Sequence, residues 1–201
     1  MVVDGIYYAL GLVAGGGLVS WLARPLWALP LFVLAVFCLW FFRDPERAIP
    51  EGDVAVSPAD GKVVAVKNEP GGLTRISVFL NIFDVHVNRA PIGGKITGIT
   101  YQPGKFLVAS REEASTQNET NTFIVEGDGA RVVFKQIAGL IARRIVCWSK
   151  VGDLVRKGDR VGLIKFGSRV DILLGSEWKT AVTEGQRVCA GSSVIAHRLR
   201  H

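Results

Sequence analysis

The residues best suited to chemistry in this sequence lie in three separate places along the chain. A Gly-Ser pair, Gly167-Ser168, is one of three Gly-Ser steps. Two motifs upstream set it apart, Ser-Pro-Ala-Asp-Gly at 57–61 and Asp-Val-His-Val-Asn-Arg-Ala-Pro at 84–91. A serine hydroxyl, an imidazole and a carboxylate are the groups from which proteins build nucleophilic and acid-base chemistry. These three segments are therefore the candidate site.

The histidine and the aspartate of these motifs each have an ordinary structural interpretation as well. His86 is the one histidine inside the main domain, because His197 and His201 belong to a basic C-terminal tail. A lone histidine after an apolar run is either a hydrogen-bonded core residue or a catalytic group, and both interpretations stay open. Asp60 precedes Gly61, where an aspartate commonly forms a turn.

Two other chemistries fit the sequence less well. A catalytic zinc site needs about three protein ligands, typically at least two histidines and a carboxylate, and the domain offers His86 alone. We therefore expect no metal. A carrier domain presents a modified lysine between apolar residues at a hairpin tip. Lys165 lies between Ile164 and Phe166, but it follows a turn and does not occupy a second hairpin tip.

Composition divides the chain near residue 43. The first 42 residues carry two opposite charges, Asp4 and Arg24, so the net charge of +6 belongs to the remaining 159 residues. A basic domain beside an apolar segment indicates either nucleic acid or an anionic membrane surface as the partner. No nucleic-acid motif is present in the sequence, and the apolar segment favours the membrane. We expect a membrane-anchoring segment at 1–42 and a catalytic domain at 43–201.

The apolar segment contains two charge-free stretches, 6–23 and 25–42. Each is long enough to form a helix of about 27 Å, close to the hydrocarbon thickness of a bilayer. The pattern predicts a helical membrane hairpin, or one spanning helix beside a half-inserted one. A signal peptide is disfavoured because Asp4 stands where such peptides carry a positive charge. Arg43 and Arg47 follow the second stretch and predict that the main domain lies on the cytoplasmic side of the cell membrane.

The three cysteines show no disulfide or metal-like spacing, which favours a reducing compartment.

From residue 53 onward short β-branched runs alternate with glycine turns, which predicts a mainly β domain. Seven runs have strand length: 63–66, 75–80, 95–101, 121–125, 131–135, 142–147 and 161–165. One short helix is expected near 110–117. The segment 151–162 is similar to the hammerhead turn of lipoyl and biotinyl carrier domains. This similarity indicates the fold and says little about the chemistry. The expected fold is a carrier-like hybrid β-sandwich or barrel with an N-terminal hydrophobic helical anchor.

The motifs, taken together and in order, resemble the phosphatidylserine decarboxylase proenzymes of the short bacterial and archaeal kind. The resemblance covers residues 42 to about 174. The motifs are Phe-Arg-Asp-Pro at 42–45, those at 57–61 and 84–91, Pro-Gly-Lys-Phe at 103–106, Asn-Glu at 118–119, Ala-Gly at 138–139 with Ile-Ala-Arg-Arg at 141–144, and Lys-Phe-Gly-Ser-Arg at 165–169. Each motif is weak alone, but the ordered set is specific.

The resemblance implies that Ser168 becomes its own cofactor, a covalent pyruvoyl group. Its hydroxyl attacks the carbonyl of Gly167, the chain is cut between these residues, and residue 168 becomes pyruvoyl. A base must take the hydroxyl proton. The family suggests His86 as that base, with Asp60 orienting it as in a serine-protease triad. The products are a β chain, 1–167, and an α chain, 168–201, which form a heterodimer that can associate further.

The implied reaction converts phosphatidylserine of the membrane to phosphatidylethanolamine and carbon dioxide, through a Schiff base on the pyruvoyl group. Longer relatives carry a second histidine three residues after the first, where this chain has Arg89. Either His86 serves both steps, or Arg89 binds the carboxylate or phosphate of the substrate while another group provides the base. We favour His86 for both steps and keep Arg89 as a candidate substrate ligand. Two alternatives stay open: a membrane-tethered carrier-like module without chemistry, and an ether lipid bearing serine as the substrate.

Overall fold

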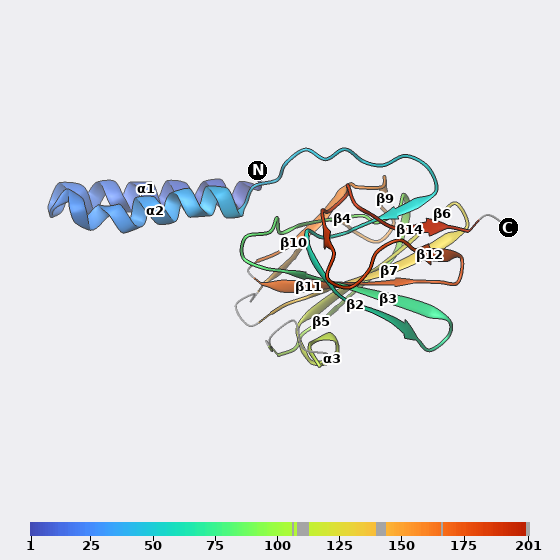
Figure 1. Cartoon of the computed structure of the whole chain (residues 1–201). Coiled ribbons are helices and arrows are strands. Elements are labelled where there is room, and N and C mark those ends of the chain that lie inside the picture. The colour runs from blue at the N-terminus through green and yellow to red at the C-terminus, as the bar shows by residue number, and fades with distance from the viewer. Residues whose placement is uncertain (106, 108–112, 140–143, 166, 200–201) are drawn as a thin grey trace. The chain divides into compact units, whose positions relative to one another are not determined.

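A computed structural model describes residues 1–105, 107, 113–139, 144–165 and 167–199. The chain forms two compact units, residues 1–46 and residues 47–201. The first is helical, and the second is built almost entirely of strands (Figure 1).

The helical unit consists of α1 (Val3–Leu22) and α2 (Pro25–Phe41), which lie side by side (Figure 1). The Val2 amide donates to the Phe42 carbonyl at 3.0 Å, so the start of α1 meets the end of α2. Small residues fill much of the contact between the helices, because Gly5, Ala9, Gly16, Ala28 and Ala35 are buried. Close approach through small residues is how apolar helices pack in membranes.

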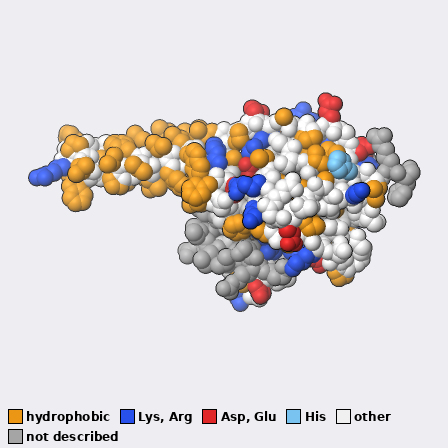
Figure 2. All heavy atoms as spheres, in the orientation of Figure 1, with side chains coloured by type: hydrophobic (Ala, Val, Ile, Leu, Met, Phe, Trp, Pro, Cys, Tyr) orange, Lys and Arg blue, Asp and Glu red, His pale blue; other side chains and the backbone are white. Residues whose placement is uncertain are grey.

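The outer surface of this unit is made of large apolar side chains, which Figure 2 shows as a nearly continuous orange surface. Trp21 and Trp27 are among the most exposed. Of the described helices, α1 alone is both long and apolar enough to cross a membrane, since α2 has 17 residues. At ~1.5 Å per residue α1 is about 30 Å long.

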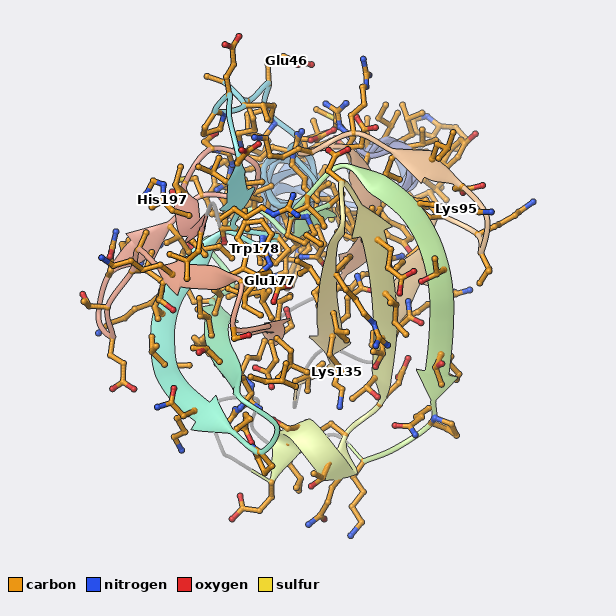
Figure 3. The ribbon with its side chains drawn as sticks, turned by 90° about the vertical axis from the view of Figure 1, so that its right-hand side faces the viewer. Glu46, Lys95, Lys135, Glu177, Trp178 and His197 are labelled. Carbon is orange, nitrogen blue, oxygen red and sulfur yellow. The ribbon has the colours of Figure 1, made fainter. Side chains whose placement is uncertain are left out.

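The main sheet of the second unit is antiparallel and has the strand order β13-β2-β3-β11-β7-β6-β5-β9. It curls into a half-barrel, whose open side faces the viewer in Figure 3. Its strands are β2 (Gly61–Glu69), β3 (Leu73–Leu80), β5 (Gly94–Gln102), β6 (Thr120–Gly127), β7 (Ala130–Ile137), β9 (Leu154–Val155), β11 (Ser168–Leu174) and β13 (Arg187–Val188).

Two three-stranded sheets complete the domain, β1-β14-β12 and β4-β10-β8. Their strands are β1 (Val54–Val56), β4 (Val87–Arg89), β8 (Ile145–Cys147), β10 (Arg160–Ile164), β12 (Trp178–Thr180) and β14 (Val194–Arg198). The apolar core contains side chains of all three sheets, among them Val78, Phe134, Ile172, Val161 and Ile195. The described residues are mainly β, as the sequence predicts.

Each of the seven predicted strands has a counterpart in the described residues, namely β2, β3, β5, β6, β7, β8 and β10. The counterpart of the run at 142–147 is β8, at 145–147, and residues 142 and 143 lie outside the described ones. The predicted short helix is α3 (Ala114–Gln117); the residues at 110–112 lie outside the described ones. Sequence reasoning missed the other seven strands, β1, β4, β9, β11, β12, β13 and β14. The most consequential of these is β11, which lies between β3 and β7 in the middle of the main sheet and begins at Ser168.

Candidate functional site

The Gly-Ser step lies where the chain enters the centre of the main sheet. Ser168 is the first residue of β11 and pairs with Leu80 of β3. It is 0% exposed, and its hydroxyl has no hydrogen-bond partner among the described residues. Gly167 has a φ of +50°, in the left-handed region that glycine adopts most readily. A buried hydroxyl without a partner is unusual, and it marks a candidate reactive group.

His86 lies immediately before β4 and is 0% exposed. Its Nδ1 is 2.9 Å from the backbone carbonyl oxygen of Asp84. A carbonyl only accepts hydrogen bonds, so this contact assigns the proton to Nδ1 in the neutral ring. Nε2 is then the basic nitrogen. The local backbone thus selects the tautomer that a general base requires.

Strand register places His86 and Ser168 on facing sides of two sheets. The His86 carbonyl accepts from the Ile164 amide at 3.3 Å, so His86 continues the pairing of β4 with β10. Alternation along an extended chain puts His86 on the same side as Asn88. The Asn88 Oδ1 accepts from Gln136 Nε2 of β7 at 2.8 Å, across the space between the sheets.

The same alternation applies on the opposite side of that space. Gln136 pairs with Val170 of β11, and Ser168 lies two residues before Val170 and therefore on the same face. The structure thus brings the histidine and the serine, 82 positions apart in sequence, into the same interior layer.

Asp60 lies in the turn before β2, and hydrogen bonds hold this turn against β4. The Pro58 carbonyl accepts from the Arg89 amide at 2.9 Å and from Asn88 Nδ2 at 3.4 Å. The carboxylate itself binds Arg47 at 2.8 and 3.0 Å and accepts from the Ala190 amide at 2.7 Å. The orienting role expected of Asp60 toward His86 stays a prediction, because these contacts join Asp60 to other groups.

Asp84 is a residue of the candidate site that sequence reasoning did not single out. Its backbone carbonyl holds the His86 ring, its Oδ2 accepts from the Asn81 amide at 2.9 Å, and its Oδ1 forms an ion pair with Arg187. The Asp-Val-His spacing in the sequence could have indicated this contact, because the carbonyl of a residue two positions before a histidine is close enough to reach its ring.

Arg89, expected to bind substrate, is buried with its Nη1 3.1 Å from the Gly158 carbonyl oxygen. Gly158 belongs to the hammerhead turn, and alternation places Arg89 on the side of β4 opposite Asn88. The substrate-binding role stays a prediction. The contact that the structure shows favours a role in holding the turn.

Buried amides line the interior beside the site. Asn121 Nδ2 donates to Gln136 Oε1 at 3.1 Å, which extends the Asn88–Gln136 contact to β6. Asn118 Nδ2 donates to the carbonyl of Ala138, just beyond the end of β7, at 2.7 Å. Glu119 Oε1 accepts from the Ile145 amide at 3.4 Å. The Asn-Glu motif thus connects three segments around the start of β11.

The structure does not describe every residue that the sequence motifs contain. Phe106, Ile141 to Arg143, Phe166 and His201 lie outside the described residues. Lys165, the lysine of the carrier interpretation, is buried at the end of β10. An acceptor lysine must be reachable, so this burial disfavours the carrier interpretation. Among the described residues there is no group of three potential metal ligands.

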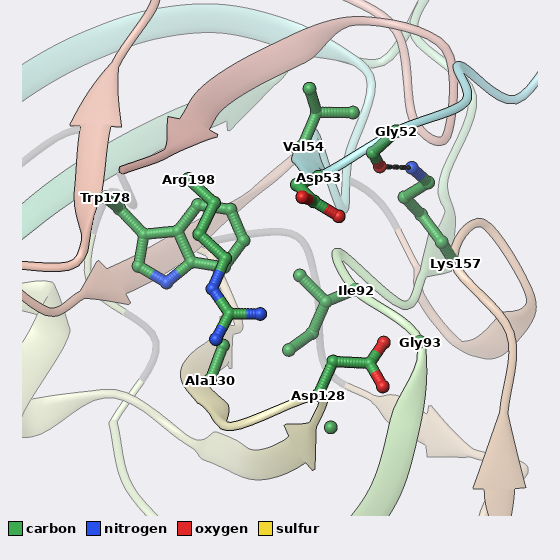
Figure 4. Close-up of a pocket in the computed structure, with 11 residues that line it drawn as sticks. Gly52, Asp53, Val54, Ile92, Gly93, Asp128, Ala130, Lys157, Trp178 and Arg198 are labelled. Carbon is green, nitrogen blue, oxygen red and sulfur yellow. Dashed lines mark hydrogen bonds between the residues drawn. The ribbon is translucent and has the colours of Figure 1, made fainter. Parts of the chain in front are cut away.

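A separate pocket of about 210 Å³ lies elsewhere in the domain (Figure 4). It is lined by Asp53, Asp128, Lys157 and Arg198, together with Trp178. Burial lowers the pKa of Lys157, although Asp53 and a second carboxylate act in the opposite direction. Because its charges are balanced and its described lining contains neither the serine nor the histidine above, this pocket is not the candidate site.

Comparisons with known proteins agree with the resemblance in the sequence. The family model described as phosphatidylserine decarboxylase matches residues 34–196. A phosphatidylserine decarboxylase proenzyme from Solibacter usitatus (strain Ellin6076) is 65% identical over 199 residues, which is 99% of this chain and 97% of the relative. A second, from Syntrophus aciditrophicus (strain SB), is 47% identical over 184 residues, 88% of this chain and 84% of the relative. The chain therefore belongs to the phosphatidylserine decarboxylase family.

Proposed function

We propose that this protein cuts itself between Gly167 and Ser168 and then decarboxylates phosphatidylserine to phosphatidylethanolamine. The observation that carries the proposal is the state of Ser168. Its hydroxyl is fully buried, has no hydrogen-bond partner among the described residues, and faces the layer that contains His86. Phosphatidylserine is proposed as the substrate because the names of the relatives contain it.

In the cutting step, Nε2 of His86 takes the proton of the Ser168 hydroxyl, and the oxygen attacks the Gly167 carbonyl carbon. The peptide C–N bond breaks, the nitrogen of Ser168 gains the proton, and an ester joins the two residues. Loss of the Ser168 Cα proton then breaks the Cβ–Oγ bond and releases Gly167 as a carboxylate. Water replaces the nitrogen of the remaining dehydroalanine, ammonia leaves, and residue 168 becomes pyruvoyl.

Strand pairing explains how the domain keeps its fold after the cut. Residues 168–201 form β11, β12, β13 and β14. β11 pairs with β3 and β7, β13 pairs with β2, and β14 pairs with β1. Every one of these partners belongs to residues 1–167. The two products therefore stay together as a heterodimer through the sheets.

For decarboxylation, the pyruvoyl group supplies an electrophilic carbonyl that binds the substrate amine and takes up the electrons released with carbon dioxide. The residues of the chain provide the surroundings. Residue 168 and His86 are both 0% exposed, so the carboxylate of the substrate loses its hydration when it enters the site. This desolvation favours the release of the carboxylate as uncharged carbon dioxide. His86 is placed to return a proton to the product.

The helical unit and the charge of the domain support action at a membrane. The outer surface of α1 and α2 is apolar, and the net charge of +6 belongs to residues 43–201. Anionic lipids attract such a charge. We propose that the hairpin anchors the protein in the cell membrane, with the catalytic domain on the cytoplasmic side because Arg43 and Arg47 follow α2.

Intact mass of the purified full-length protein tests the cut. We expect two fragments that meet between Gly167 and Ser168, the smaller with an N-terminus that lacks an amine. Ser168→Ala should stay whole. Ser176→Ala, which removes the serine of another Gly-Ser step, should cut normally. A single 21.8 kDa chain for the wild type would refute self-cleavage.

Activity on phosphatidylserine in vesicles, measured as released carbon dioxide, then tests the substrate. Cut wild type should release it and uncut Ser168→Ala should not. Cut protein that acts on an ether analogue but not on the acyl lipid would replace the proposed substrate.

A further inference from the structure

The loop between β3 and β4 exposes apolar side chains close to the site. Phe83 is 68% exposed and Ile82 is 37% exposed, whereas His86, three residues after Phe83, is 0% exposed. A single exposed apolar residue is ordinary on a protein surface. Two adjacent ones, on a segment that ends at the proposed catalytic base, call for a physical reason.

Hydrogen bonds fix the shape of this loop. The Asp84 amide donates to the Asn81 carbonyl at 3.1 Å, and the Phe83 amide donates to Asn81 Oδ1 at 2.7 Å. The Asn81 amide donates in turn to Asp84 Oδ2 at 2.9 Å. The turn thus satisfies several of its own backbone donors, so it can enter an apolar environment with less loss of hydrogen bonding to water.

Arg187 contacts the loop, and a second basic residue lies beside Arg187. Asp84 is paired with Arg187, whose side chain is 64% exposed. Arg187 of β13 lies directly opposite Lys62 of β2, and Lys62 is exposed. Like charges opposite each other on neighbouring strands destabilise a sheet. An anionic surface would offset that repulsion, and apolar residues beside exposed cations are the pattern of segments that bind at membrane interfaces.

We propose that the Ile82–Phe83 tip inserts into the headgroup region of an anionic lipid bilayer, with Lys62 and Arg187 against the lipid phosphates. The inference rests on the proposed function. A lipid substrate must travel from the bilayer to a serine that is fully buried, and the loop that contacts the bilayer is the same segment that positions His86. Insertion therefore places the entrance of the site at the membrane surface.

Activity of the full-length protein on two forms of substrate tests this. The variant carries Ile82→Ser and Phe83→Ser together. Its rate on phosphatidylserine in mixed phosphatidylcholine vesicles should fall at least tenfold relative to its rate on a short-chain phosphatidylserine dissolved as monomers. Leu154→Ser is the matched control, because Leu154 is 84% exposed and pairs with Lys95 near the start of β5, remote from the loop. The control should change neither rate.

The outcomes separate the two proposals. Equal losses on vesicles and monomers, or no loss on either, would overturn the insertion of the loop. A wild type that is cut but decarboxylates neither form refutes the proposed substrate instead.

A fluorescence measurement of membrane binding tests the insertion of the loop independently of catalysis. In vesicles with brominated acyl chains, a Phe83→Trp variant should lose more tryptophan fluorescence than Leu154→Trp does, each compared with wild type. Equal quenching in the two variants would overturn the inference.

Discussion

The backbone at the proposed cut offers a test that leaves every reactive group in place. Gly167 has a φ of +50°, and a Cβ added there would meet no atom of the described residues within 4 Å. A Gly167→Ala change therefore causes no clash with that part of the chain. Its whole cost comes from holding an L-residue in the left-handed region, about 1–2 kcal/mol. The carbonyl that Ser168 would attack in the proposed cut belongs to this residue, so the strain would act on the reacting bond.

This cost sets the size of the expected effect. If the cut needs the left-handed conformation, about 1–2 kcal/mol lowers its population, and therefore the rate, by about 5–30-fold. Asparagine tolerates this region better than other non-glycine residues. Gly167→Asn should therefore be slowed less than Gly167→Ala, and Gly167→Val more.

The assay follows the two fragments over time after synthesis, by intact mass. Gly185→Ala is the control, because Gly185 has a φ of +90° and an added Cβ likewise has no atom within 4 Å among the residues that the structure describes. It should lose similar folding stability without slowing the cut. Gly167→Ala protein that cuts as fast as wild type would refute the reasoning, as would equal slowing by Gly185→Ala.

Two further predictions concern the interior of the site. His86→Ala should leave an uncut or inactive chain, because it removes the base; mass and carbon dioxide release check this, and a fully cut, fully active variant would contradict it. Gln136→Ala removes the shared partner of Asn88 and Asn121. Unpaired buried amides cost about 1–3 kcal/mol each, so the midpoint of urea unfolding should fall; an unchanged midpoint would show that the amides find other partners.

The triad that the resemblance implies stays a prediction, and the contacts of His86 and Asp60 suggest an alternative way of orienting the ring. The group seen against the Nδ1 of His86 is the Asp84 carbonyl, while the Asp60 carboxylate binds Arg47 and the Ala190 amide. A carbonyl fixes the tautomer as a carboxylate does, but without a negative charge beside the ring. An Asp60→Asn variant that still cuts itself would agree with orientation by the carbonyl.

The sequence by itself indicated the family, singled out the candidate Gly-Ser step and predicted half of the strands. Alternating β-branched runs and glycine turns are local properties, because a strand's two faces and a turn's φ are set by neighbouring residues. The ordered motifs needed no structure either. The apolar stretches at 6–23 and 25–42 likewise predicted the two helices, because of their length and their lack of charge.

Only the tertiary structure decided which groups meet at the site. The strand β11 escaped sequence reasoning, and its charged residues Arg169 and Asp171 are buried together with Nε and Oδ1 2.8 Å apart. Likewise Asp60 binds Arg47 and the Ala190 amide. The register of β4 and β11 places His86 toward the layer of Ser168. These contacts join residues far apart in the chain, so they depend on sheet order and register, which alternation and turn residues leave open.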